Sequence, residues 1–278
     1  MSLLSLINPR RLLDRSGHDL LVMGDERLAA EPPGRFANTG FALMLAAAVW
    51  GVGAAWLWGA SWELFGGVGN SELAMPAAVT LAAIVAWPLR RALASLVETL
   101  FGRDATVRSL CGAALLILMF AAMFHLKADW SRSEWAMWQP IAGIRPQCKI
   151  YRVLILMPLW GCWSMLAVCQ FCKKPPAEPD GKGGTSAPMA TFARSCGPGA
   201  TALWLAIALA ASMGYYGYMG EGAQLTMAGA SIAAAIVGTL ILCRLGGGLT
   251  RRALLAGNAL TQLVHLLTFL ALQNIAIA

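Results

Sequence analysis

The sequence predicts an all-α, polytopic integral membrane protein with about seven transmembrane helices. Apolar residues make up 58% of the 278 residues, and charged residues make up 13%, against roughly 25% in an ordinary soluble domain. Apolar runs close to the ~20 residues that cross a bilayer also recur along the chain. We therefore expect one transmembrane domain over residues 39–278, preceded by an interfacial segment over residues 1–38.

The N-terminal segment alternates short leucine clusters with charges of both signs. This pattern favours one or two amphipathic helices on the cytoplasmic membrane surface, and it fits a partly ordered tail equally well. We do not expect a cleavable signal peptide, because the Arg10–Arg11 pair is followed by more charge and not by a long apolar stretch.

Seven apolar runs predict the membrane helices. The second run is expected to be short, tilted or re-entrant, because Arg90 and Arg91 interrupt it. The last three runs are rich in small residues, which allow helices to approach closely and predict a tight bundle. The seven runs lie near residues 39–60, 75–92, 109–126, 153–172, 199–219, 224–243 and 253–276.

Two of the connections are long. The outer loop, 127–152, carries Trp130, Trp135 and Trp138, which are typical of an aromatic belt on an in-plane helix and would also suit a docking surface. The inner loop, 173–197, is rich in Pro, Gly and small polar residues, which predicts an irregular conformation.

The distribution of Lys and Arg predicts the orientation. Sixteen of the 21 fall in the N-terminal segment and in alternate connections, which places the N-terminus in the cytoplasm and the C-terminus outside. We expect a multi-pass protein of the cell inner membrane. The net charge of +7 follows from this topology. The sequence contains no basic stripe interleaved with aromatic residues, so we expect no nucleic-acid partner. The expected partners are the bilayer and further subunits of a membrane assembly.

Cysteines suggest a metal or redox site only weakly. Cys169 and Cys172 form a CxxC at the inner end of the fourth run, and Cys162 lies two turns earlier on nearly the same face. A zinc site would need a fourth donor, and only Cys196 is nearby. Packing of small apolar side chains is the favoured interpretation, and we predict no metal site.

The last run is unusually polar for a membrane helix. Asn258, Thr261, Gln262 and His265 share one face at spacings of three or four residues. These groups suit interhelical hydrogen bonds or the lining of a ligand site. The carboxylates within or bordering the apolar runs are single, whereas phosphoryl or nucleotidyl transfer normally uses a divalent ion held by two or more of them.

Residues 247–263, GGLTRRALLAGNALTQL, resemble the C-terminal motif of the cobalamin (5'-phosphate) synthases, the membrane adenosylcobinamide-GDP ribazoletransferases, approximately GGLTGDVLGAANELTEL. Arg251 and Arg252 stand at the family's Gly and Asp, and Ala259 and Gln262 stand at its two glutamates. The matching residues are Gly247, Gly248, Leu249, Thr250, Leu254, Ala256, Asn258, Leu260, Thr261 and Leu263.

Three further stretches are similar to family segments in the same order. They are LVETLFGRD at 96–104, LMPLWGCWSM at 156–165 and KKPPAEPDGKGG at 173–184. The resemblance implies an all-helical inner-membrane enzyme that uses Mg²⁺, joins α-ribazole or its phosphate to a nucleotide-activated corrinoid, and releases GMP. Of the family's acidic positions, Glu98 is retained, with Asp104 nearby; these two are the only candidate catalytic residues.

The substitutions predict a catalytically altered relative of this fold. Replacing an acid by Arg252 turns a cation site into an anion site. We therefore predict a structural or binding subunit that needs no cofactor, with an anion or ligand site formed by Arg251, Arg252, Asn258, Gln262 and His265.

Two alternatives remain open at this stage. The first is an active Mg²⁺-dependent ribazoletransferase whose altered metal site uses Glu98, Asp104 and Asp180. The second is a small-molecule transporter, for which the polar stripe on the last run and the short second run are the available signs.

Overall fold

The computed structural model shows helices and short turns throughout the part of the chain that it describes. Its elements are α7, α8, α10, α11, the π-helix η5, α12 and α13, together with two shorter helices, Leu43–Ala55 and Ala92–Phe101. The residues described are 43–45, 47–55, 89, 92–102, 104–127, 149–172, 196–216 and 219–276. Within them, four helices are long and apolar enough to cross a membrane.

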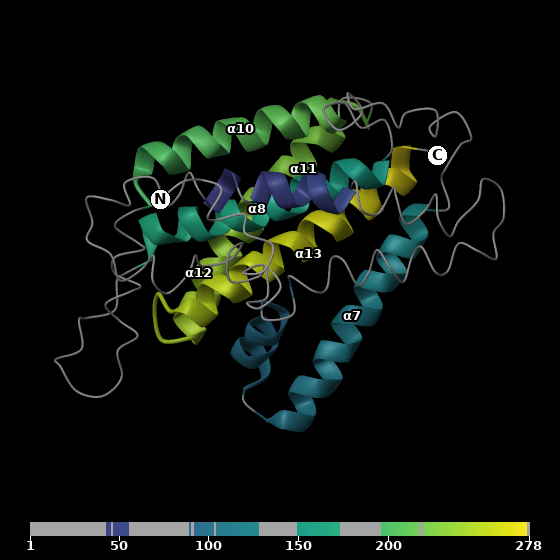
Figure 1. Ribbon diagram of the computed structural model, residues 1–278. Coiled ribbons are helices and arrows are strands. Elements are labelled where there is room, and N and C mark those ends of the chain that lie inside the picture. Colours follow the sequence, from purple (N-terminus) through teal and green to yellow (C-terminus); the bar gives the residue numbers. More distant parts are fainter. Residues whose placement is uncertain are drawn as a thin grey trace.

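Helix α8, Lys149–Phe171, lies in the centre of the bundle (Figure 1). Nearly all residues of its apolar stretch Arg152–Phe171 are buried within the protein, as expected for a helix that is hydrophobic on every side. The helix Leu43–Ala55 packs closely against it, since a Cβ added to Gly51 would lie 2.8 Å from the backbone of Ile155.

Helix α13, Arg251–Ala276, packs along α8 and against η5 and α12. Two glycines allow these close contacts. A Cβ at Gly161 of α8 would lie 2.7 Å from the Gln262 side chain, and a Cβ at Gly257 of α13 would overlap the side chain of Thr239. Gly257 therefore serves the close packing predicted for the last runs, whereas Gly161 belongs to the fourth run, and a Cβ at Gly214 or Gly229 of the fifth and sixth runs would meet nothing within 4 Å.

Helix α10, Pro198–Tyr216, covers one side of α8. Two indole groups of α8 attach it: Trp160 Nε1 donates to Ser212 Oγ at 3.0 Å, and Trp163 Nε1 donates to the carbonyl of Thr201 at 3.0 Å. The opposite face of α10 exposes large apolar side chains such as Leu203 and Met213. Such a face suits contact with lipid.

The predicted sixth run forms one continuous helical stretch, Glu221–Leu245, but it is not a uniform α-helix. It consists of α11, Glu221–Ala233, a π-helical turn η5, Ala234–Gly238, and α12, Thr239–Leu245. The π turn packs against both α8 and α13. Hydrophobicity alone did not predict it, because this run is apolar on nearly every side and a shift in helical phase leaves no mark on such a pattern.

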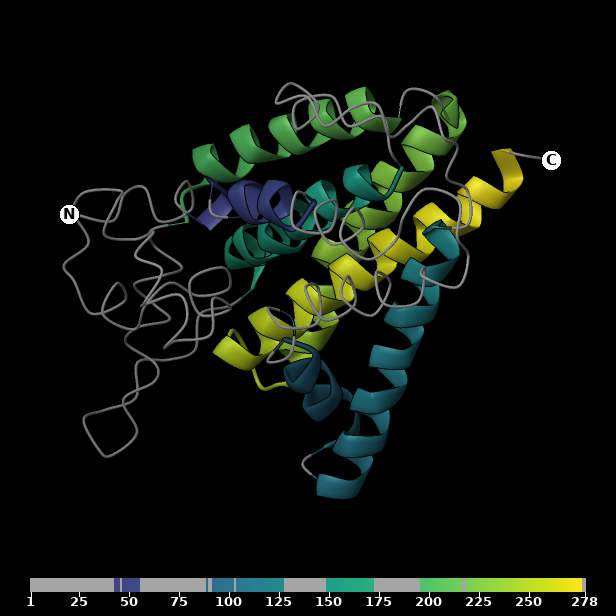
Figure 2. The same cartoon turned by 45° about the vertical axis from the view of Figure 1, so that its right-hand side comes forward.

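Helix α7, Ala105–Lys127, diverges from the bundle toward its N-terminal end in both views (Figures 1 and 2). Leu110 and Ile117 are each 67% exposed, so this apolar helix has little protein around it in its first four turns. Ala92–Phe101, which precedes it, was predicted as part of a connection and is helical instead. It buries Leu93 and Val97, whose spacing suits one face of a helix too short to be detected as a span.

The four long apolar helices correspond to the predicted fourth to seventh runs. The first and third runs are seen as the helices Leu43–Ala55 and α7, whereas most of the second run lies outside the described residues. The 1–38 segment and nearly all of both long loops also lie outside the described residues. These loops include Trp130, Trp135, Trp138 and Asp180. Lys149 is already helical, so α8 begins inside the stretch predicted as the outer loop. Aliphatic stems of Lys and Arg allow a membrane helix to extend past its apolar core.

Candidate functional site

The polar stripe of α13 lies inside the protein. Asn258 is 1% exposed, Gln262 6% and His265 0%, and Thr261 is equally buried and donates to the carbonyl of Gly257 at 2.8 Å. The predicted common face is therefore confirmed as a buried face. Burial of polar groups is costly unless they form hydrogen bonds, so their partners decide their role.

His265 joins three helices. Its Nε2 lies 2.9 Å from the Tyr216 hydroxyl of α10, and its Nδ1 lies 2.8 Å from Ser231 Oγ of α11. Ser231 Oγ also donates to the carbonyl of Met227 at 2.8 Å, so a neutral imidazole that donates from Nδ1 to Ser231 and accepts at Nε2 from Tyr216 satisfies all of these groups. The hydrogen bonds on both ring nitrogens fix the orientation of the imidazole between the three helices.

The two amides of the stripe face α8. Gln262 Nε2 donates to Asn258 Oδ1 at 2.8 Å, and Asn258 Nδ2 lies 3.7 Å from Cys162 Sγ and 3.6 Å from Met165 Sδ. The side chain of Gln262 fits against the bare backbone of Gly161. These contacts are those of an interhelical polar network, the first of the two roles considered for the stripe. A ligand-binding role for Asn258, Gln262 and His265 stays a prediction.

The start of α13 is set by a tight glycine turn. Gly247 has φ 80° and Gly248 has φ 127°, a region that side chains disfavour. The N–H of Gly248 donates to the carbonyl of Cys243 at 2.7 Å, which closes the end of α12. Thr250 then caps α13, because its Oγ1 accepts the N–H of Ala253 at 3.2 Å. The GGLT stretch thus reverses the chain and begins the last helix.

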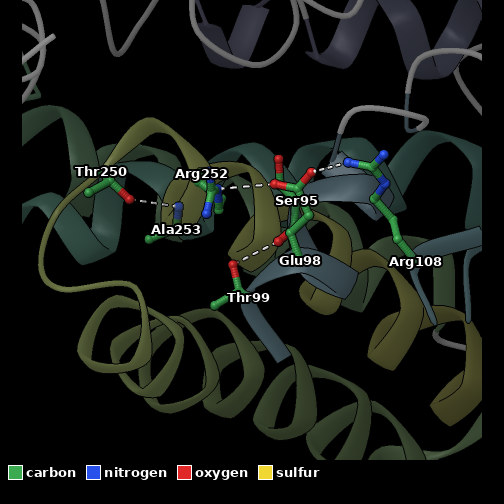
Figure 3. A network of polar contacts seen from close by, with 7 residues as sticks. All are labelled: Ser95, Glu98, Thr99, Arg108, Thr250, Arg252 and Ala253. Atoms are coloured by element: carbon green, nitrogen blue, oxygen red, sulfur yellow. Dashed lines mark hydrogen bonds and ion pairs between the residues drawn. The ribbon is translucent and has the colours of Figure 1, made fainter. Parts of the chain in front are cut away.

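Immediately after this turn, Arg252 reaches a carboxylate from another part of the chain (Figure 3). Arg252 Nε lies 3.3 Å from Glu98 Oε2, and Arg108 Nη1 of α7 lies 2.8 Å from Glu98 Oε1. The side chain of Glu98 is 20% exposed, and those of Arg108 and Arg252 are 45% and 37% exposed. The carboxylate of Glu98 therefore links the Ala92–Phe101 helix to both α7 and α13, and this link is partly exposed to water.

Asp104, the second candidate acid, has a local structural role. Its Oδ1 accepts the N–H groups of Thr106 at 2.8 Å and Val107 at 3.0 Å, so it caps the N-terminus of α7. No three His, Cys, Asp or Glu side chains in the described part of the chain gather closely enough to hold a metal ion.

The three side chains of this contact carry one net positive charge, and Asp104, one turn before Arg108 at the N-terminus of α7, adds a negative charge next to them. Glu98 contributes one negative charge, whereas Arg108 and Arg252 contribute two positive charges. Arg251 begins α13, but its side chain lies outside the described residues. A guanidinium that contacts water and a shared carboxylate can exchange that carboxylate for an oxyanion such as phosphate.

Sequence reasoning identified both Glu98 and Arg252 but did not pair them. It also missed Arg108, Tyr216 and Ser231, which supply the partners. Tyr216 and Ser231 lie in apolar runs where a hydroxyl indicates a buried hydrogen bond, and this signal was available in the sequence. Arg108 was counted only toward topology, because no pattern in the sequence relates it to a residue ten positions earlier. In comparisons with known proteins, no family model, curated protein or solved structure matches the chain.

Proposed function

We propose that this protein is a multi-pass protein of the cell inner membrane, with a cobalamin-synthase-like fold in which an ion pair has replaced the metal site. In this proposal it lacks transferase activity and acts as a structural or anion-binding subunit of a membrane assembly. The four long apolar helices support the membrane setting. The remaining spans and the cytoplasmic N-terminus rest on the apolar runs and the distribution of Lys and Arg.

The observation that carries the proposal is the contact between Glu98 and Arg252. These residues belong to two stretches, 96–104 and 247–263, that separately resemble motifs of the synthase family. In a magnesium enzyme of this design, residues at such a corner would be acids that hold the ion. Here a guanidinium already neutralises Glu98, and a second from Arg108 adds positive charge that repels a divalent cation.

The contacts of both candidate acids count against the transferase alternative. Glu98 is shared by two arginines, and Asp104 is engaged by the first turn of α7. A carboxylate held by two guanidiniums is a poor ligand for Mg²⁺, which needs oxygen donors free to complete its octahedral coordination. The same arginines suit an anionic group, because each presents several N–H donors in a plane.

The proposed replacement of a metal site by an ion pair can be tested by restoring the acid and removing the positive charges. We would compare the wild type with an Arg108→Gln/Arg252→Asp double variant in detergent, with Arg108→Gln alone and Arg244→Asp as controls. Arg244 lies in the last turn of α12 and is exposed, and it forms no ion pair with Glu98, so Arg244→Asp reproduces the charge change of Arg252→Asp without altering the Glu98 ion pairs.

Restoring an acid beside Glu98 should create a site for divalent cations. We expect Mg²⁺ or Mn²⁺ to raise the Tm of the double variant in a saturable manner and to leave the wild type and both controls unchanged. Absence of this gain would show that the corner is not a converted metal site. Turnover of a nucleotide-activated corrinoid by the wild-type chain would overturn the loss of activity directly.

The subunit role needs a separate measurement. We expect the tagged protein, extracted from its native membranes in mild detergent, to elute with a second chain in defined stoichiometry. Elution as a single chain that retains no partner after chemical cross-linking in the membrane would contradict this part of the proposal.

A further inference from the structure

Both arginines that contact Glu98 lie in the first turn of an apolar helix. Arg108 is the fourth residue of α7, and Arg252 is the second residue of α13. The residues that follow each of them are largely apolar. The two guanidiniums therefore lie where the polar end of a helix meets its apolar body, which in a membrane protein is the level of the lipid headgroups.

Glu98 shows that an oxyanion fits between the two guanidiniums. Its carboxylate is contacted by Arg108 Nη1 and Arg252 Nε from different sides (Figure 3). An arginine carries five N–H donors in a planar fork, so these contacts leave donors on both side chains for a second anion. The side chains of Arg108 and Arg252 are 45% and 37% exposed, so a ligand reaches them without entering the bundle.

The charge balance at this corner favours an anion. Glu98 offsets one of the two arginine charges. Asp104 adds a negative charge, but its Oδ1 accepts the N–H groups of the first turn of α7, where the positive end of the helix dipole opposes that charge. The N-terminus of α13 places a second positive dipole end beside Arg252. A phosphate group with one negative charge would neutralise the remaining positive charge.

Large apolar side chains are exposed on the two elements that carry Glu98 and Arg108. Phe101, 55% exposed, lies one helical turn after Glu98. Leu116, 42% exposed, lies about two turns after Arg108 on α7. A soluble phosphate compound gains nothing from such neighbours, whereas the acyl chains of a phospholipid pack against them.

We propose that the anion at this corner is the phosphodiester of an acidic phospholipid, with Arg108 and Arg252 on the phosphate and Phe101 and Leu116 along the acyl chains. The assignment rests on the proposed anion-binding function and names its ligand. Basic sites between membrane helices on the cytoplasmic side bind acidic lipid headgroups. The distribution of Lys and Arg predicts that side for both arginines.

The full-length protein in detergent can be titrated with phosphatidylglycerol while its Tm is recorded. We expect a saturable rise in Tm for the wild type. Arg108→Gln/Arg252→Gln should bind the lipid at least about tenfold more weakly, because two charge-assisted hydrogen-bonding groups are removed. Arg244→Gln is the matched control and should respond as the wild type does, because Arg244 is an exposed arginine of α12 outside the described contacts of Glu98. An equal rise with phosphatidylcholine of the same acyl chains, or an equal rise in the double variant, would overturn the proposal.

A second comparison separates a lipid from a soluble anion. Phe101→Ser should weaken the binding of phosphatidylglycerol and leave the effect of inorganic phosphate unchanged, because phosphate makes no contact with the apolar surface. Leu203→Ser is the matched control on α10, where the side chain is 53% exposed, and it should change neither. Inorganic phosphate that stabilises the wild type as much as phosphatidylglycerol does would assign the site to soluble anions and refute the lipid.

Failure of the lipid assignment and failure of the proposed function give different results. If phosphatidylglycerol has no effect but inorganic phosphate still raises the Tm of Glu98→Gln, the lipid assignment is wrong and the anion site stands. If neither ligand acts on any of these proteins, the anion-binding function is wrong as well. The comparison of the two lipids on the wild type decides the question even where a variant does not fold.

Discussion

At its first turn α13 carries a guanidinium that meets a carboxylate in contact with water. Further along the same helix, Asn258, Gln262 and His265 are polar groups sealed from water. The side chains of Arg252 and Glu98 are 37% and 20% exposed, but Asn258 and His265 are 1% and 0% exposed. Charges occur where solvent can screen them, and neutral donors and acceptors occur where only protein partners are available.

This difference separates the part of α13 that can bind a ligand from the part that holds the fold. A ligand can reach Arg252 without disturbing the bundle. To reach Asn258 or His265 it would have to displace hydrogen bonds that connect α13 with α8, α10 and α11. The four changes described next should therefore have large effects on stability in the buried region and small effects at the charged corner.

The largest effect is expected from His265→Ala. The change removes two hydrogen bonds, leaves the hydroxyls of Tyr216 and Ser231 without their imidazole partner and opens a cavity. We expect the free energy of unfolding to fall by about 2–5 kcal/mol. Reversible unfolding of purified protein in mixed micelles measures this. A loss no larger than that caused by Glu98→Gln would show that the two regions do not differ as described.

Gly257→Ala should be the next most severe change, because its methyl group would overlap the side chain of Thr239. Overpacking of this kind costs about 1–3 kcal/mol. Gly229→Ala in α11 is the matched control, since a Cβ there meets nothing within 4 Å. The control should be neutral or stabilise the helix by up to about 1 kcal/mol. Equal behaviour of the two variants in the same unfolding assay would refute close packing of α12 against α13.

Asp104→Ala should destabilise the protein by about 0.5–2 kcal/mol, because it removes the N-terminal cap of α7. Asp104→Asn provides the informative comparison. An amide oxygen can still cap the helix, so the Asn variant should retain most of the stability. If unfolding shows both variants to be equally impaired, the negative charge of Asp104 matters for some other reason, such as binding a cation.

Glu98→Gln should have the smallest effect on stability, about 0.2–1 kcal/mol at low salt and less at high salt, because partly exposed ion pairs are weak and screened. It should change binding more. Without the carboxylate, Arg108 and Arg252 lack their compensating charge, so inorganic phosphate should raise the Tm of this variant more than that of the wild type. Arg252→Gln in the same background should reduce the gain; a gain that survives it would place the phosphate site elsewhere.

Much of the fold could be predicted because it follows from local composition. Apolar runs of membrane length predicted α8, α10, α13 and the continuous stretch Glu221–Leu245, and a spacing of three and four placed Asn258 and His265 on one buried face. Where local composition was ambiguous, prediction failed. The helix Ala92–Phe101 is too short and too close to charges to be recognised as an apolar run, and the π turn η5 leaves no mark on hydropathy.

The sequence by itself determined which segments are helical and apolar and which residue types each carries, because hydrophobicity and helical periodicity act over a few turns. Only the tertiary structure decided the partners: Glu98 with Arg252 and Arg108, and His265 with Tyr216 and Ser231. Such pairs depend on how separate helices cross in the bundle. No local pattern encodes the geometry that brings side chains from distant segments within hydrogen-bonding distance.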